Sequence, residues 1–168
     1  MKRLLILGAV LAALGLAACG GDSGGSSSAD ASAGNATVSA EQISGAGTVL
    51  VDSAGQALYA SDEEAGGMAR CTDDACMSFW HPLTVDGNAP TGGSLPGKLA
   101  VAKRPDGDRQ VTYNGKLLYT FSQDQPGEVT GDGFADAFGG QQFTWHVVHA
   151  NGAQDSSGSD NTSSGIYG

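Results

Sequence analysis

Apolar and polar positions alternate with a period of two in several short runs of this chain, and no run has the period of a long amphipathic helix. The plainest pattern lies in residues 104–124. Gln110–Tyr113 alternate polar with apolar or aromatic residues, Asn114-Gly115 suits the positive φ angles of a type I′ turn, and Lys116–Phe121 is rich in strand formers. This stretch predicts a tight β-hairpin.

A looser copy of the same pattern lies sixty residues upstream. Four positions of the first copy recur in the second, namely Val51, Gly55, Leu58 and Tyr59 as Val111, Gly115, Leu118 and Tyr119. A closing segment recurs at an offset of sixty-five, so that Trp80–Gly87 aligns with Trp145–Gly152. Each unit is a hairpin, a polar loop and a Trp-led strand, too small to bury its own apolar face, so the two units should pack on each other.

The predicted fold is a mainly β, single compact domain over 48–152, with at most short helical turns. It consists of two tandem hairpin-plus-strand repeats packed with pseudo-twofold symmetry: repeat one (48–87) and repeat two (98–152). Further strands are expected at Leu99–Lys103 and Phe143–His149, and the only helical signal is one turn at Cys76–Trp80, before Pro82.

The first 18 residues indicate an export signal. A short basic start precedes an apolar run of small residues that is shorter than the roughly 20 residues of a membrane-spanning helix. The box Leu16–Cys19 resembles the bacterial lipoprotein signal, in which cleavage leaves a lipidated cysteine at the new N-terminus. We therefore expect cleavage before Cys19, acyl chains on its thiol and attachment to a membrane. The alternative is a soluble secreted protein cut near Ala18.

Small polar residues dominate both flanks of the domain. Residues 19–47 are expected to form a flexible tether and 153–168 a disordered tail. The chain has 18 acidic against 8 basic residues and a net charge of −10. Because the basic residues are scattered, nucleic-acid binding is excluded, whereas an envelope protein or a small cation stays open as a partner.

These features together resemble the bacterial secreted-repeat lipoproteins of unknown function, whose tandem units carry a Tyr-x4-Asp signature. Repeat two fits the signature in full, and repeat one has Glu where Asp is usual. The residues that carry the resemblance are Tyr59, Glu64 and Trp80 in repeat one, and Tyr119, Asp124 and Trp145 in repeat two. The resemblance implies a location in the bacterial cell envelope outside the cytoplasm, and no established activity comes with it.

Cys71 and Cys76 are separated by a four-residue spacer and face an oxidising compartment after export. A disulfide is therefore expected. A thiolate metal site is the alternative, and it would need ligands beyond these two.

We expect the chain to bind no cofactor. The alternative is a copper or haem site, for which several residues are suitable. His81 and His146 occupy equivalent positions in the repeats, so pseudo-twofold packing could bring two imidazoles together, and Met68 and Met77 are further candidates. The family usually has Pro and Tyr at the two histidine positions. We therefore favour ordinary packed or surface histidines.

Two acidic features invite a chemical interpretation. Tyr119 and Asp124 could form a proton-relay pair, but no nucleophile and base accompany them, so we expect Asp124 to cap the turn that it begins. The glycine-rich loop 124–136 carries Asp124, Glu128, Asp132 and Asp136, a Ca²⁺-like composition without the EF-hand spacing.

The sequence thus predicts a lipid-anchored envelope protein with a non-catalytic binding or structural β-repeat domain. No catalytic constellation is found. A metal- or haem-binding or electron-transfer accessory is the alternative.

Overall fold

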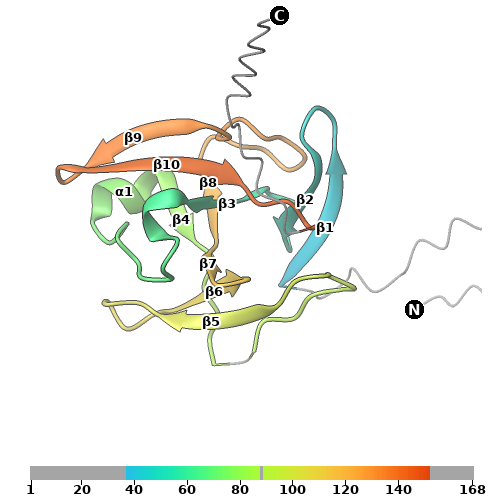
Figure 1. Cartoon of the computed structure of the whole chain (residues 1–168), viewed down its shortest axis with the longest axis horizontal. Helices are drawn as coiled ribbons and strands as arrows, with labels where there is room; N and C mark the ends of the chain where they lie inside the picture. The colour runs from blue at the N-terminus through green and yellow to red at the C-terminus, as the bar shows by residue number, and fades with distance from the viewer. Residues whose placement is uncertain (1–36, 88, 152–168) are drawn as a thin grey trace, which may run out of the picture.

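The computed structural model describes residues 37–87 and 89–151 (Figure 1). In chain order its elements are β1 (Val38–Ile43), β2 (Gly47–Asp52), β3 (Leu58–Ser61), the 3-10 helix η2 (Asp62–Glu64), α1 (Asp74–Phe79), β4 (Trp80–Pro82), β5 (Leu99–Lys103), β6 (Arg109–Tyr113), β7 (Lys116–Leu117), β8 (Tyr119–Phe121), β9 (Phe134–Phe138) and β10 (Gln141–Val147). The prediction of a mainly β, compact domain with short helical turns is confirmed. Among the described residues no helix has the length and apolarity needed to span a membrane.

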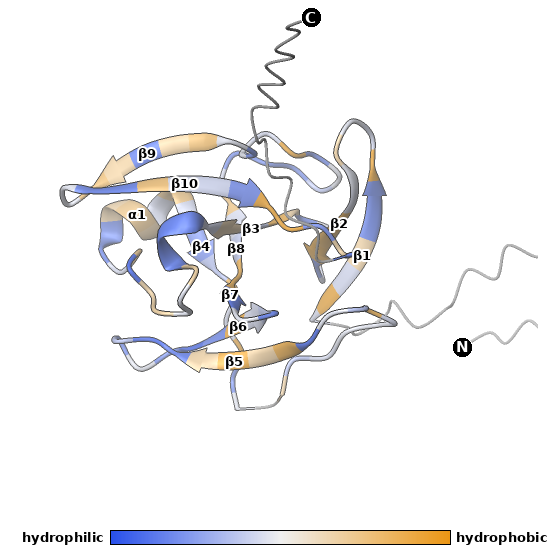
Figure 2. Cartoon of the chain, viewed as in Figure 1, coloured by the Kyte–Doolittle hydropathy of each residue, from blue (hydrophilic) through white to orange (hydrophobic). Residues whose placement is uncertain are grey.

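The strands form three antiparallel sheets. The largest has the order β4-β8-β3-β10-β9, and it is accompanied by a two-stranded sheet, β1-β2, and a three-stranded sheet, β5-β6-β7. Figure 1 shows β9 and β10 running together over α1 at the top, β1 and β2 at the right, and β5 at the bottom, across the domain from β9 and β10. Apolar and polar residues are mixed along β9 and β10 (Figure 2), as expected for strands with one face buried.

The register of the large sheet joins the two repeats at equivalent residues. Tyr59 on β3 lies directly opposite Tyr119 on β8. Outward from this pair, Trp80 of repeat one lies opposite Phe121 of repeat two, and Trp145 of repeat two lies opposite Ser61 of repeat one. Each Trp-led strand therefore pairs with the other repeat's tyrosine strand, and neither repeat forms this sheet alone.

Two-residue turns set the tight hairpins. Asn114 has φ 50° and Gly115 φ 84°, which confirms the type I′ turn between β6 and β7. After Leu117 the chain leaves this sheet, and β8 belongs to the large one, so the single strand expected over Lys116–Phe121 is divided. This division lets one short stretch connect two sheets.

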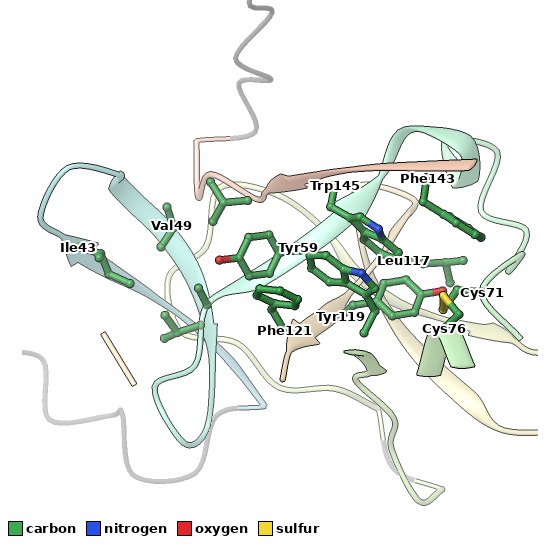
Figure 3. Close-up of a cluster of buried hydrophobic side chains, with 14 residues drawn as sticks. Ile43, Val49, Tyr59, Cys71, Cys76, Leu117, Tyr119, Phe121, Phe143 and Trp145 are labelled. Carbon is green, nitrogen blue, oxygen red and sulfur yellow. A yellow bond between two sulfur atoms is a disulfide. The ribbon is translucent and has the colours of Figure 1, made fainter. Parts of the chain in front are cut away.

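Most large apolar side chains belong to one of two clusters. The first contains the aromatic rings shown in Figure 3, and its members Trp80 and Trp145 are fully buried. The second lies around Leu50, Leu58 and Leu118. Leu58 and Leu118 are equivalent residues of the two repeats, so the shared core draws on both, as the sequence predicts.

The prediction of a flexible tether over 19–47 is wrong at the C-terminal end of that segment. Val38–Ile43 form β1, which pairs with β2, and both Val38 and Ile43 are buried. The segment has only these two large apolar residues, and its composition hides that they close a hairpin. The rest of the tether, the signal segment, Cys19 and the tail lie outside the described residues.

Candidate functional site

The family-motif carboxylate of repeat two binds the tyrosine of repeat one. Tyr59 donates its hydroxyl hydrogen to Oδ2 of Asp124 at 2.5 Å and accepts the backbone N–H of Gly131 at 3.2 Å. The other carboxylate oxygen, Oδ1, accepts the backbone N–H of Thr130 at 3.0 Å and its hydroxyl. Asp124 therefore spans to Thr130 rather than capping the turn that follows it, which corrects the expectation from the sequence.

Tyr119 meets the matching carboxylate of repeat one, Glu64. Oε1 of Glu64 accepts the backbone N–H groups of Arg70 and Cys71, the latter at 2.8 Å. Oε2 is buried and has no hydrogen-bond partner, yet the Glu64 carboxylate lies close enough to the Tyr119 hydroxyl to contribute, after desolvation, to the raised pKa of that tyrosine. The contact between Glu64 and Tyr119 is thus the weaker of the two.

The two contacts are made by equivalent residues of the two repeats. Arg70 and Thr130 are sixty residues apart, and each donates its backbone N–H to the motif carboxylate of its own repeat. Each carboxylate then reaches the tyrosine of the other repeat. We call these two contacts, Tyr59 with Asp124 and Tyr119 with Glu64, the crossed tyrosine–carboxylate pairs.

Burial governs the chemistry of both tyrosines. Their side chains are fully buried. Desolvation is the main cause that raises the pKa of Tyr59, with the hydrogen bond to Asp124 second, and desolvation followed by the Glu64 carboxylate raises the pKa of Tyr119. Both hydroxyls therefore stay protonated at neutral pH and act as hydrogen-bond donors. Tyr119 and Asp124 do not form a relay with each other.

Arg104 is a functional-site candidate that the sequence did not predict. Its side chain is only 1% exposed and forms an ion pair with Asp106 at 3.0 Å. The guanidinium also donates to Oε1 of Gln110 at 2.7 Å and to the carbonyl oxygen of Cys71 at 2.7 Å, and it lies 3.4 Å from the Tyr119 hydroxyl. The Asp two residues after Arg104 was the only sequence signal for this buried cation.

The equivalent tryptophans of the two repeats stack on each other. The ring centroids of Trp80 and Trp145 are 4.1 Å apart and their planes differ by 12°. Both indole N–H groups donate to one carboxylate, Asp136, at 2.8 and 3.1 Å. The sequence marked Asp136 only as an acid of the glycine-rich loop, and its position as the single acid on the apolar face of β9 was the missed signal.

The disulfide is confirmed. Cys71 and Cys76 are bonded and fully buried, with 5.6 Å between their Cα atoms. Asp73 between them caps α1 by accepting the backbone N–H of Cys76. Repeat two has β9 where repeat one has this disulfide and α1, so the repeats diverge after Cys71 and Gly131.

The metal candidates are not brought together. His81 lies on β4 and His146 on β10, with β8 and β3 between them, a separation of about 14 Å at about 4.8 Å per strand. Met77 packs against Arg104, with its sulfur 3.4 Å from Nη2, and Met68 is 73% exposed. Within the described part of the chain no group of three or more His, Cys, Asp or Glu side chains is placed to hold a metal ion.

His146 has two acidic neighbours of its own. Its Nε2 lies 3.4 Å from Asp62 and its Nδ1 lies 3.6 Å from Asp132. All three side chains are partly exposed. Of the two candidate histidines in the described structure, His146 is therefore the one with carboxylate groups beside its ring.

The acids of the glycine-rich loop point to separate partners. Asp124 binds Tyr59, Asp136 binds the two indoles, Glu128 accepts the backbone N–H of Gln125, and Asp132 accepts that of Val147. The loop therefore fastens the repeats together rather than converging on a common point. Figure 3 shows Tyr59 and Tyr119 among the aromatic rings of the first core cluster.

The fold and these contacts define a β-repeat module whose two units are bound together by their motif residues. Residues 100–149 match the model of a family described as a secreted repeat of unknown function. The match covers Tyr119, Asp124 and Trp145, so the resemblance found in the sequence is confirmed for repeat two, and it indicates a location outside the cytoplasm. No curated protein and no solved structure gives a significant match.

Proposed function

We propose that this protein is a lipid-anchored component of the bacterial cell envelope whose β-repeat domain is a non-catalytic binding or structural module. The observation that carries the proposal is the pair of crossed tyrosine–carboxylate contacts. The family-motif residues are buried and engaged with one another, so their role is to hold the two repeats in one sheet.

The chemistry of the motif supports a structural role. A general acid or base works best with a pKa near the operating pH and needs access to a substrate. Tyr59 and Tyr119 have neither, because burial raises the pKa of each and closes each off from solvent. Binding to a partner would then use surfaces that the crossed pairs hold in place.

Three independent features support export from the cytoplasm, and the first of them also supports the lipid anchor. The start of the chain carries an export signal with a lipidation box ending at Cys19. Repeat two matches a secreted family. The Cys71–Cys76 disulfide is typical of proteins in an oxidising compartment, as found outside the cytoplasm.

Replacing the lipidation residue tests the anchor. We expect Cys19→Ala to move the protein from the membrane fraction to the soluble fraction, and mass spectrometry of the parent to show acyl chains on an N-terminal cysteine. The double variant Cys71→Ala/Cys76→Ala is the matched control, because it removes cysteines without touching the box, and it should stay on the membrane. Membrane retention of Cys19→Ala would contradict the anchor.

A metal-binding function is the second candidate, favoured by one observation. The 3.4 Å between His146 Nε2 and an Asp62 oxygen is a separation that two ligands of one transition-metal ion adopt. Titration with Cu²⁺, followed by absorption, tests it: His146→Ala should lose the signal and His81→Ala, the equivalent residue of repeat one, should keep it. An absorption spectrum of the protein purified from its own envelope tests haem in the same way.

A further inference from the structure

The large sheet ends in a strand that has no neighbour on its outer side in the described structure. β9 is the last strand of the order β4-β8-β3-β10-β9, and Ala135 and Ala137 on it are exposed. Thr144, which lies opposite Ala135, donates its backbone N–H to Glu63 at 2.8 Å, away from β9. Since hydrogen-bonded and non-hydrogen-bonded pairs alternate along an antiparallel ladder, the backbone N–H and C=O groups of Ala135 and Ala137 point outward.

This outer edge lacks the usual protection. Natural edge strands are shortened or carry Pro, Lys or an outward charge, because a bare edge recruits another strand. The opposite edge strand, β4, has three residues and ends in Pro82. β9 has five residues with neither Pro nor Lys, and its one acid, Asp136, is directed inward to the two indoles.

We propose that β9 pairs antiparallel with β9 of a second copy of this chain, forming a symmetric dimer. The strand reads Phe-Ala-Asp-Ala-Phe, which is the same in both directions. A twofold axis through Asp136 places Ala135 of one copy opposite Ala137 of the other, so the outward backbone groups of the two copies meet. An isologous contact requires such self-complementarity.

The dimer also covers exposed aromatic rings. Of the three large apolar side chains that are exposed in the described structure, Phe79 and Phe134 flank this edge, each 42% exposed. Phe79 contacts Phe138 within its own copy, with ring centroids 5.9 Å apart. In the paired register Phe134 of one copy faces Phe138 of the other and adds to this contact at both ends of the strand.

Charge and area make the dimer weak. Asp132 precedes β9, and Asp73 lies beside the turn that follows it, 3.7 Å from where a Cβ of Gly139 would be. These acids of the two copies approach each other, so salt should strengthen the association by screening them. One five-residue edge with its rings belongs among small interfaces, below about 1,200 Å², for which micromolar to millimolar dissociation constants are expected.

The dimer is tested by sedimentation velocity on the chain that begins at residue 19 and carries Cys19→Ala. This variant lacks the lipid. We expect a concentration-dependent dimer that strengthens between about 20 and about 300 mM salt. Ala137→Pro removes an outward N–H without removing a bond to β10, and it should weaken the dimer at least tenfold. Ala137→Lys should act in the same direction, and Ala100→Lys, an exposed alanine on β5, is the matched control that should dimerise like the parent.

Several results would overturn the proposal. A parent that stays monomeric up to about 1 mM in high salt excludes it, as does a dimer that survives both substitutions at Ala137. Equal weakening by Ala100→Lys would assign the effect to overall charge. If β9 binds a basic peptide but not a second copy, and binds it more weakly as salt rises, the partner of this edge is a different protein. Unchanged near-ultraviolet circular dichroism of the tryptophans verifies that each variant is folded.

Discussion

Tyr59 of repeat one and Asp124 of repeat two, sixty-five residues apart, share a buried hydrogen bond of 2.5 Å. The signature pairs a tyrosine and an acid within one repeat, yet in the folded domain the contact crosses between repeats. The motif thus connects repeats rather than forming a site within one, and a single repeat would leave a buried carboxylate without its donor.

Removing the Tyr59 hydroxyl tests this link. We expect Tyr59→Phe to lower the free energy of unfolding by about 1–3 kcal/mol, because Oδ2 of Asp124 then stays buried without its donor. Urea unfolding of Tyr59→Phe, Asp124→Asn and the double variant measures the coupling between the two. Independent, additive losses would contradict a direct bond.

The crossed pair in repeat one should be weaker. Oε2 of Glu64 has no hydrogen-bond partner, so Tyr119→Phe should lower the free energy of unfolding by less than Tyr59→Phe does. The substitution removes the same atom from an equivalent, equally buried position, which makes the two variants mutual controls. A larger loss for Tyr119→Phe would show that Glu64 and Arg104 hold that hydroxyl more tightly than the described geometry indicates.

The stability of the domain should fall in alkali. Burial raises the pKa of Tyr59 and of Tyr119 in the folded state, so their protonated forms contribute stability that is present below the unfolded pKa of about 10 and is lost as pH rises above it. Each tyrosine adds a slope of about 1.4 kcal/mol per pH unit.

Urea unfolding between pH 8 and pH 11 measures this slope. Lys116 titrates in the same range with the opposite sign, because burial lowers its pKa. The difference between the parent and Tyr59→Phe/Tyr119→Phe therefore isolates the tyrosines, and the double variant should show the shallower decline. Parallel curves would mean that neither tyrosine resists ionisation in the folded state.

The sequence predicted the features that neighbouring residues determine. It missed the contacts that depend on which repeat a side chain meets. Asn114-Gly115 specified its turn, and the offset of sixty residues identified Tyr59 and Tyr119 as equivalent. An offset cannot say whether a carboxylate meets the tyrosine of its own repeat or of the other one, because both keep the same sequence pattern. Only the order β4-β8-β3-β10, in which strands of repeat one and repeat two alternate throughout, decides it.

The sequence missed the strands β1 and β9 for the same reason: both depend on residues distant in the chain. β1 has two large apolar residues and was assigned to the tether by composition, although its stability comes from pairing with β2. Glycines surround β9, so the sequence predicts an acidic loop in its place. Its alternation of Phe and Ala around Asp136 becomes meaningful only when Trp80, from the other repeat, lies beneath it.

Reducing the disulfide should destabilise the domain only modestly. The bond between Cys71 and Cys76 closes a short loop, and in the chain-entropy model such a bond contributes about 2 kcal/mol. Cys71→Ala/Cys76→Ala should therefore fold, with a lower midpoint in urea. A variant that fails to fold would show that α1 and the Arg104 contact to the Cys71 carbonyl depend on the bond itself.

Asp136 allows the sharpest test of how the two repeats are held together. Its two carboxylate oxygens each accept one indole N–H, from Trp80 and from Trp145, and an asparagine has a single acceptor oxygen. Asp136→Asn should therefore keep one of these bonds and leave the other indole facing an amide donor, at a cost of about 1–3 kcal/mol. Asp136→Ala loses both bonds and should cost more. Because the stacked rings should give a coupled near-ultraviolet circular dichroism signal, its loss in both variants, measured below the unfolding transition, would show that the carboxylate sets the geometry of the stack. An unchanged signal would instead assign that geometry to packing alone, against Phe121 on one side and Phe143 on the other.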